Sequence, residues 1–190
     1  MTPVTQMATG ERILAAAAEM TAELGWSCVT MAAVAERVGV SRQTVYNEWG
    51  SRDRLAEAMV LRELGNFLDA VDAGFDAHPR DLESGTSEAI QRVIDLAGVN
   101  PLLRAIVTAT HGAETELVPL LTTRADVVIA VARERVADRL VTYSGVQRDS
   151  VEIVSDILVR TVLSHVMQPG PDSPSTPVHL ARATTRLLVP

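Results

Sequence analysis

The chain has 190 residues, of which 47% are hydrophobic and only 3% aromatic, and its formal net charge is −7 with a pI near 5.1. The hydrophobic fraction excludes a disordered chain, and the length suits one ordinary domain or a small module joined to a larger one. A core made mostly of Ala, Val, Leu and Ile favours closely packed helices. The single cysteine, Cys28, excludes an internal disulfide and a cysteine zinc site, and we expect it to be buried.

The first residues lack the layout of a secretory signal, and no apolar run approaches the roughly 20 residues that span a bilayer. We therefore expect a cytoplasmic protein with no membrane partner. This expectation agrees with a reducing compartment, where a lone thiol persists without forming a disulfide.

Three short helices are predicted at the N-terminal end. Apolar residues recur at helical spacing over residues 9–24, with Thr9 as the expected N-cap and Gly25 placed to end the helix in a left-handed conformation. The second and third helices are predicted over residues 31–38 and 41–49.

The rest of the chain also carries helical patterns. A long fourth helix is predicted from the residue after Ser51 to about Ala77, and the polar stretch HPRDLESGTS, which contains Pro79 and Gly85, is interpreted as a break. Further helices are predicted over residues 86–98, 101–111, 115–142, 148–167 and 178–189, with a loop over 168–177. Because no strand-like alternation appears, the predicted fold is all-α with about nine helices.

The segment TMAAVAERVGVSRQTVYNEW has the spacing of a helix-turn-helix. Two short helices joined by a tight turn cross steeply, so the small Ala35 suits their closest approach and Gly39 suits the turn. Val45 is expected to fill the angle between the helices, while Thr30 and Ser41 are the predicted N-caps. Any compact helical hairpin can hold such small residues, so the helix-turn-helix assignment depends also on the caps and on the polar face.

The outward face of the second motif helix is predicted to read DNA bases. It consists of Arg42, Gln43, Thr44, Tyr46 and Asn47. Gln and Asn can bind adenine through two hydrogen bonds, Arg can bind guanine, and the Thr methyl can contact that of thymine. Tyr46 and the helix N-termini at Thr30 and Ser41 suit phosphate oxygens, and Arg52 is expected to neutralise another phosphate.

Residues 11–60 resemble the N-terminal domain of the TetR family of bacterial transcriptional regulators. The resemblance is carried by ILAAAAEMTAELGW and VTMAAVAERVGVSRQTVYNEWGSRDRL, in which the residues that match the family pattern are Thr30, Gly39, Val40, Ser41, Tyr46 and Arg52. Glu48 stands where His is common in the family, and Trp49 stands where Phe is common. The resemblance implies a DNA-binding domain over residues 1–53 and an effector-binding and dimerisation domain over 54–190.

The second domain offers two further site predictions. A mostly apolar effector pocket is expected from Met59, Phe75, Leu103, Val107, His111, Leu121 and Val128. The helix over 148–167 is apolar nearly all round, so one face is expected to meet its own core and the other a second copy. The predicted dimer-interface residues are Val151, Val154, Leu158, Val162, His165 and Leu187. His111 and His165 are candidate polar contacts for the effector, and the alternatives are a helix-end role for His111 and a core or interface role for His165. For the helix over 148–167 the alternative is a central place in the core of a monomer.

The motif and the family resemblance together imply a ligand-responsive transcriptional regulator, in particular a repressor. It would bind a palindromic DNA operator as a homodimer and be released by a small, largely apolar effector that binds the two states with different affinity. Activation remains an alternative, as do a small α-helical enzyme and a protein-interaction module. The sequence has no catalytic constellation and no phosphate-binding Gly loop, and its histidines lack metal-ligand spacing, so neither a cofactor nor a metal is expected.

Overall fold

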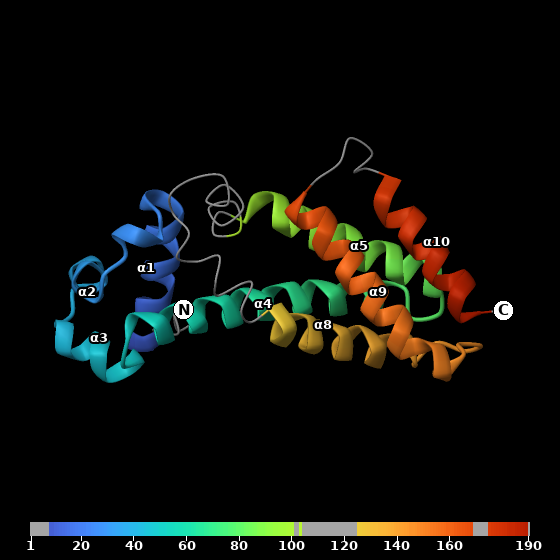
Figure 1. Ribbon diagram of the computed structural model, residues 1–190, viewed down its shortest axis with the longest axis horizontal. Helices are drawn as coiled ribbons and strands as arrows, with labels where there is room; N and C mark the ends of the chain where they lie inside the picture. Colours follow the sequence, from blue (N-terminus) through green and yellow to red (C-terminus); the bar gives the residue numbers. More distant parts are fainter. Residues whose placement is uncertain (1–7, 101–102, 104–124, 169–174, 190) are drawn as a thin grey trace, which may run out of the picture. The chain divides into compact units, whose positions relative to one another are not determined.

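A computed structural model describes residues 8–100, 103, 125–168 and 175–189 (Figure 1). Within these ranges the chain forms eight α-helices and one short 3-10 helix and contains no strand, so the all-α prediction is confirmed. The helices are α1 (Thr9–Leu24), η1 (Trp26–Cys28), α2 (Met31–Val38), α3 (Arg42–Trp49), α4 (Arg52–Ala77), α5 (Leu82–Val99), α8 (Ala125–Leu140), α9 (Arg148–Met167) and α10 (Thr176–Leu188). Apart from residue 103, the predicted helix over 101–111 lies outside the described residues, as does the start of that over 115–142.

The first four predicted helices are confirmed, with bounds that agree to within about one residue. Two predictions about the ends of the first helix are wrong. Ala8, and not Thr9, is the N-cap of α1, and it makes no side-chain capping bond. Gly25 ends α1 with φ 81° and ψ 157°, a positive-φ conformation outside the left-handed helical region. In that conformation its N–H still donates to the Thr21 carbonyl at 3.0 Å, so the last turn of α1 remains closed.

The described chain divides into two compact units between Glu63 and Leu64, within α4. In the first unit, α1 packs against η1, α2 and α3. Its core consists of Ile13, Leu14, Ala17, Met20, Trp26, Val29, Met31, Val34, Ala35, Val45, Leu55, Ala56 and Met59. The last three residues come from α4, so the first two turns of this helix complete the core of the N-terminal unit.

In the second unit, α5 packs against α10 and α9, and α9 also contacts α8 and α10. The core consists of Phe75, Leu82, Ala89, Ile90, Val136, Leu140, Tyr143, Val151, Val154, Leu158, Val159 and Leu188. Ion pairs join α4 to α8 along the edge of this core, between Asp72 and Arg135 and between Asp76 and Arg139. No helix among the described residues has the length and apolar character needed to cross a membrane.

The break predicted over HPRDLESGTS is shorter than expected, because α5 already begins at Leu82. Asp81 caps this helix by accepting a hydrogen bond from the Ser84 N–H at 3.0 Å. Gly85 lies inside the helix, where a Cβ atom would be only 2.6 Å from the Tyr143 hydroxyl. The glycine therefore makes room for a side chain from a distant part of the sequence and does not mark a turn.

Helix α9 turns a different face outward from the one predicted for a dimer interface. Val151, Val154 and Leu158 are 3%, 4% and 6% exposed in the single chain, which leaves almost no surface for a second copy to cover. This part of the interface prediction is corrected, because these three residues pack into the core of their own unit. Of the other predicted residues, Val162 and His165 are half-buried, whereas Leu187 on α10 is exposed.

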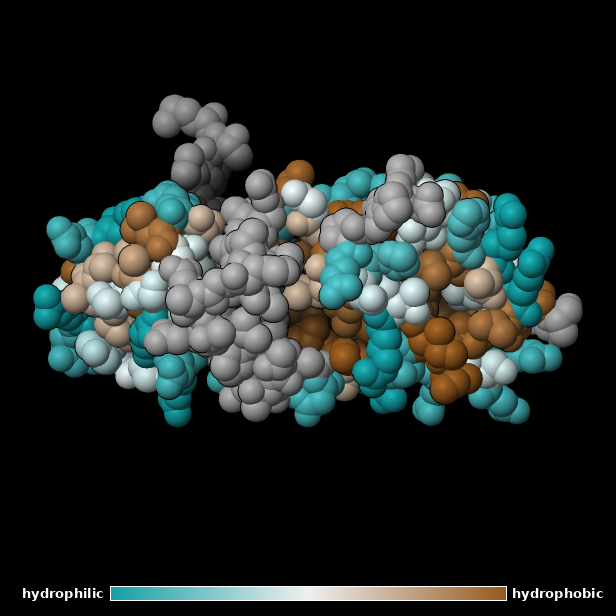
Figure 2. Space-filling view, turned by 45° about the horizontal axis from the view of Figure 1, so that its top comes forward, coloured by the Kyte–Doolittle hydropathy of each residue, from teal (hydrophilic) through white to brown (hydrophobic). Residues whose placement is uncertain are grey.

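Exposed apolar residues do occur on α9 and α10. Ile153 and Ile157, four residues apart on α9, are 60% and 50% exposed, and Val178 and Leu187 are exposed on α10. Figure 2 shows hydrophobic residues gathered on the surface of this unit. Ile153 and Ile157 lie on the same side of α9 as the ion pair between Asp156 and Arg160. Such charged pairs are typical of the solvent-facing side of a helix.

Candidate nucleic-acid interface

Helices α2 and α3 form the helix-turn-helix that the sequence predicts. Ala35 and Val45 are both buried in the core of the first unit, as their places at the closest approach and in the helix angle require. Gly39 adopts φ 75° and ψ 37°, a left-handed conformation that glycine enters without steric cost. Its N–H donates to the carbonyls of Ala35 and Glu36 at 3.0 and 3.2 Å, which closes the turn.

Both predicted N-caps of the motif are confirmed. The Thr30 hydroxyl oxygen accepts a hydrogen bond from the Ala33 N–H at 3.1 Å, at the start of α2. The Ser41 hydroxyl oxygen accepts one from the Thr44 N–H at 3.0 Å, at the start of α3. Each cap satisfies an otherwise unpaired N–H, so the N-terminal turns of both helices are held in place before any ligand binds.

The polar face of α3 is available to a partner. Arg42, Gln43, Tyr46 and Asn47 are exposed, and Thr44 is half-buried. The Gln43 Nε2 atom donates to Asn47 Oδ1 at 2.8 Å, so the two amides are joined along the helix surface. The Ser41 and Thr44 hydroxyl oxygens lie 2.9 Å apart. The face thus presents two hydrogen-bonded pairs of polar side chains, and its one charged residue, Arg42, is exposed.

Arg52, which is predicted to neutralise a phosphate, makes its described contacts within its own unit. Its side chain is half-buried and turns toward the segment between α1 and α2. The Nε atom donates to the Val29 carbonyl at 2.7 Å and the Nη2 atom donates to the Trp26 carbonyl at 2.6 Å. The guanidinium carbon also lies 4.5 Å from the centroid of the Trp26 ring, within cation–π range.

Two more arginines of the first unit are engaged inside it. Arg12 of α1 donates to the Val38 carbonyl at the end of α2 at 2.9 Å. Arg37 of α2 pairs with Glu23 of α1 at 3.0 Å, and this hydrogen bond and the nearby negative charge raise the pKa of Arg37. Arg42, by contrast, is exposed at the first position of α3 and forms no side-chain hydrogen bond or ion pair with the described residues.

The two residues that depart from the family pattern lie close to the start of α1. Trp49 is half-buried and packs against the first core, as expected of an aromatic residue here. Glu48 Oε2 lies 3.1 Å from the position that a Cβ atom on Gly10 would occupy. Gly10 belongs to the first turn of α1, where unpaired N–H groups favour a negative charge. The Glu48 carboxylate is therefore placed to stabilise α1.

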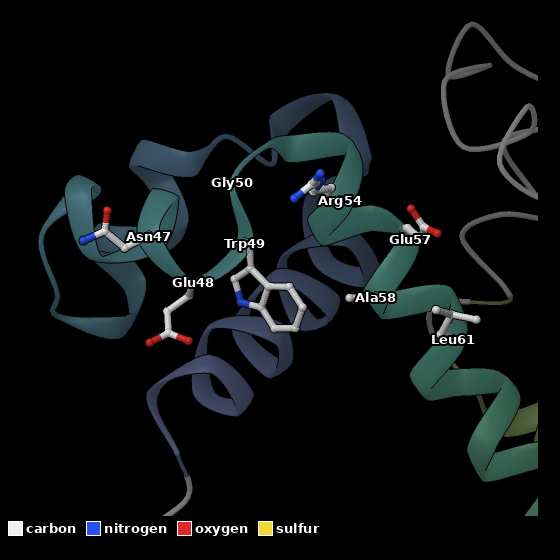
Figure 3. Close-up of a pocket in the computed structure, with 8 residues that line it drawn as sticks. All are labelled: Asn47, Glu48, Trp49, Gly50, Arg54, Glu57, Ala58 and Leu61. Atoms are coloured by element: carbon white, nitrogen blue, oxygen red, sulfur yellow. The ribbon is translucent and has the colours of Figure 1, made fainter.

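A shallow depression beside the end of α3 is open to solvent and has a volume of about 360 Å³ (Figure 3). It is lined by Asn47, Glu48, Trp49, Gly50, Arg54, Glu57, Ala58 and Leu61. The Trp49 Nε1 atom is buried and has no hydrogen-bond partner in the described part of the chain. None of the residues predicted for the effector pocket lines this depression.

The residues predicted for the effector pocket are only partly described. Met59 is buried in the core of the first unit, and Phe75 is buried in the core of the second. Leu103 and Val128 are half-buried. Val107, His111 and Leu121 lie outside the described residues. The described members therefore do not outline a cavity by themselves, and the effector pocket remains a prediction.

Cys28 is exposed, contrary to the expectation that it is buried, because η1 turns its side chain outward beside the Ser27 hydroxyl at 4.0 Å. Among the described residues, no three His, Cys, Asp or Glu side chains gather in a way that would hold a metal ion.

The capped helix pair, its left-handed glycine and its exposed polar helix define a helix-turn-helix protein. The sequence matches the bacterial regulatory proteins of the tetR family over residues 13–59 and the bacterial tetracyclin repressor C-terminal domain over residues 81–186. The chain belongs to the TetR family of bacterial transcriptional regulators. Proteins of this family bind DNA and small-molecule effectors, act as dimers and are not enzymes.

Individual relatives agree with this assignment. The HTH-type transcriptional regulator AlkX of Mycobacterium tuberculosis is 30% identical over 161 residues, which cover 84% of this chain and 75% of that protein. The crystal structure of the TetR family repressor AlkX from Dietzia sp. strain DQ12-45-1b, implicated in biodegradation of n-alkanes, has a TM-score of 0.74 at 26% identity and 95% coverage of both chains. A regulator structure from Mesorhizobium loti, at 16% identity and a TM-score of 0.69, supports the fold.

Proposed function

We propose that this chain is a transcriptional repressor that binds a palindromic operator as a homodimer and leaves it when a small, largely apolar effector binds. The observation that carries the proposal is the exposed polar face of α3, on a motif whose turn and caps are already formed. Such a regulator works on chromosomal DNA, in the cytoplasm.

Contacts to bases are assigned to the exposed side chains of α3. Gln43 and Asn47 offer amide groups that suit adenine, and Arg42 suits either guanine or a phosphate. Tyr46 is 49% exposed, and its hydroxyl suits a phosphate oxygen. The N-terminal N–H groups of α2 and α3, behind Thr30 and Ser41, supply further phosphate contacts.

A single helix-turn-helix buries too little surface to select one site in a genome, and two copies that read half-sites about 34 Å apart remove this difficulty. We assign the interface between the copies to the outward faces of α9 and α10. These faces carry Ile153 and Ile157 on α9 and Val178 and Leu187 on α10, and all four residues are exposed to water in the single chain. Covering such residues with a second copy would contribute favourable apolar burial.

The effector is proposed to carry an aliphatic chain. Support comes from the Dietzia AlkX repressor, which is implicated in biodegradation of n-alkanes and is similar to this protein over nearly its whole length. The low aromatic content also leaves aliphatic side chains as the main material for a pocket in the second unit. Release from DNA then requires that the effector bind the free conformation more tightly than the DNA-bound one.

Equilibrium binding to a duplex tests the DNA assignment. The duplex carries the inverted repeat from the promoter beside the gene, and fluorescence anisotropy is measured over a series of KCl concentrations. Because phosphate contacts release counterions, the logarithm of the affinity should fall linearly with that of the salt concentration, by about 0.9 per phosphate contacted. A scrambled duplex is the control and should bind more weakly. Salt-independent binding, or none, would leave a protein-interaction module as the better account.

The same assay tests the effector class. Fatty acids and fatty alcohols of increasing chain length are added to the preformed complex, and an aromatic acid of similar size serves as the control. We expect the aliphatic compounds to lower the affinity for the operator and the aromatic acid to leave it unchanged. If no aliphatic compound changes the affinity, the effector proposal fails while the DNA assignment stands.

A further inference from the structure

We infer that Arg52 is a positioning residue that holds the recognition motif in place, and that it does not contact DNA phosphate. This inference rests on the proposed DNA-binding function and concerns how the first unit achieves it. A basic residue at the start of a helix next to a helix-turn-helix suggests a phosphate contact from sequence, and the geometry of Arg52 points the other way.

The Arg52 guanidinium is bound on two sides within its own unit. Its Nε and Nη2 atoms donate to the carbonyls of Val29 and Trp26 at 2.7 and 2.6 Å, and its Cζ atom lies 4.5 Å from the centroid of the buried Trp26 ring. Hydrogen bonds that include a charged donor are stronger than neutral ones, and the weakly hydrated guanidinium suits stacking on an aromatic ring. These contacts hold the charged group against the segment between α1 and α2, and turning the side chain outward to a phosphate would break them.

The two carbonyls lie at the point where the chain enters the motif. The Trp26 carbonyl also accepts the Val29 N–H at 3.0 Å, which closes η1. Val29 directly precedes Thr30, the N-cap of α2. Arg52 therefore joins the first turn of α4 to the last residues before α2. Because α2 packs on α3 through Ala35 and Val45, the orientation of the recognition helix depends on this connection.

Lysine distinguishes the two roles. A lysine at position 52 keeps the positive charge and can reach a phosphate as a point charge. It cannot donate to two carbonyls in the fixed geometry of a guanidinium, and it stacks less well on tryptophan. A phosphate contact should therefore survive the change from Arg to Lys, and a positioning role should not.

Arg42 supplies a matched comparison within the same unit. It is exposed at the start of α3 and makes no side-chain hydrogen bond or ion pair with the described residues, so its charge is available to DNA. Arg42→Ala is expected to reduce the dependence of binding on salt by about the 0.9 that one phosphate contributes.

The test measures operator affinity and its salt dependence for wild type, Arg52→Lys, Arg52→Ala and Arg42→Ala, all as full-length protein. We expect Arg52→Lys to weaken operator binding about tenfold, because the two carbonyls lose their shared donor, while the salt dependence stays at the wild-type value. Arg52→Ala should weaken binding at least as much, also without a change in the salt dependence.

Circular dichroism establishes that each variant is folded at the temperature of measurement, and Arg52→Lys decides the question if Arg52→Ala is not. A second readout is the emission of Trp26 in a Trp49→Phe background, where Trp26 is the remaining tryptophan. It should change in Arg52→Lys and stay constant in Arg42→Ala.

The inference is overturned if Arg52→Lys binds the operator like wild type, or if Arg52→Ala lowers the salt dependence as Arg42→Ala does. A wild-type protein that binds no duplex in a salt-dependent way overturns the DNA-binding function itself, which is a different result.

Discussion

Gly74 of α4 and Ala89 of α5 approach so closely that a Cβ atom on Gly74 would lie 2.3 Å from the Ala89 Cα atom and 2.4 Å from its nitrogen. The two backbones of the second unit are therefore in direct contact at this crossing, with no space for a side chain on α4. Close contact between backbones leaves no flexible group that could move aside, so the crossing depends on glycine at this position.

Gly74→Ala should destabilise the second unit. The added methyl group would push against the backbone of Ala89, and overpacking of this kind costs about 1–3 kcal/mol. That cost exceeds the gain of up to about 1 kcal/mol that alanine brings to a helix interior. Urea unfolding followed by circular dichroism measures the difference.

Gly65→Ala, in the same helix, is the matched control, because nothing among the described residues lies within 4 Å of its added Cβ atom. This variant should be slightly more stable than wild type. Equal stability of the two variants would show that α4 and α5 can separate at no cost, contrary to the close contact.

Gly85→Ala should destabilise the protein through the Tyr143 hydroxyl, which would lie 2.6 Å from the new Cβ atom. Tyr143→Phe alone should cost about 0.5–1.5 kcal/mol, because its hydroxyl donates to the His78 carbonyl at 2.8 Å. In the double variant the contact with the hydroxyl is gone and only the looser contact with the Phe75 ring at 3.3 Å remains, so the combined loss should be smaller than the sum of the two single losses. Additive losses in this double-mutant cycle would contradict the contact.

Protonation of Asp81 in acid should lower the stability of the protein. The Ser84 backbone N–H and hydroxyl both donate to the Asp81 carboxylate, and these hydrogen bonds lower the pKa of Asp81. A carboxylate with a lower pKa in the folded state contributes stability above its unfolded pKa of about 3.9 and loses it as the pH falls through the folded pKa.

Asp81→Ala should cost about 1 kcal/mol near neutral pH through loss of the α5 cap, and this deficit should shrink as the pH falls below about 4. Asp81→Asn keeps a capping oxygen and serves as the control, so its deficit at neutral pH should be smaller. Urea unfolding over a pH series gives both values. A deficit of Asp81→Ala that does not change with pH would show that the ionised carboxylate adds nothing to the cap.

Ile157→Asp should convert the proposed dimer to monomers, because it places a charge in the centre of the exposed apolar face of α9. Sedimentation velocity at several protein concentrations measures the association. Leu24→Asp is the control, since Leu24 of the first unit is 51% exposed and Ile157 is 50% exposed. It should leave the association unchanged. A dimer that survives both substitutions would place the interface elsewhere.

The hydrogen bond between the Gln43 and Asn47 amides predicts that the two residues read the operator as a pair. With Gln43 Nε2 donating to Asn47 Oδ1, the Gln43 oxygen and the Asn47 amide hydrogens remain for one base edge. Gln43→Ala and Asn47→Ala should therefore relax base preference at the same position, each by about 1–3 kcal/mol, and the double variant should lose less than the sum. Selection from a randomised operator library measures this preference, and losses at two separate positions would exclude joint reading.

The sequence by itself determines the local structure of the first unit. The approximate limits of α1 to α3, the turn at Gly39 and the caps at Thr30 and Ser41 all depend on residues a few positions apart, so periodicity and capping chemistry largely suffice to predict them. The exposed side chains of α3 follow from the same short-range geometry. This is why the family could be inferred, and a helix proposed to contact DNA, before any coordinates.

The tertiary structure alone decides which partner each remaining side chain meets. Arg52 donates hydrogen bonds to the Trp26 and Val29 carbonyls, 26 and 23 residues away in sequence, and Gly85 faces Tyr143. Helix α9 is apolar on nearly every side, so its composition could not say that Val154 faces the core and Ile157 faces solvent, although the nearby ion pair of Asp156 and Arg160 was a usable sign. Such contacts depend on how helices distant in sequence pack together, and a local pattern carries no record of that packing.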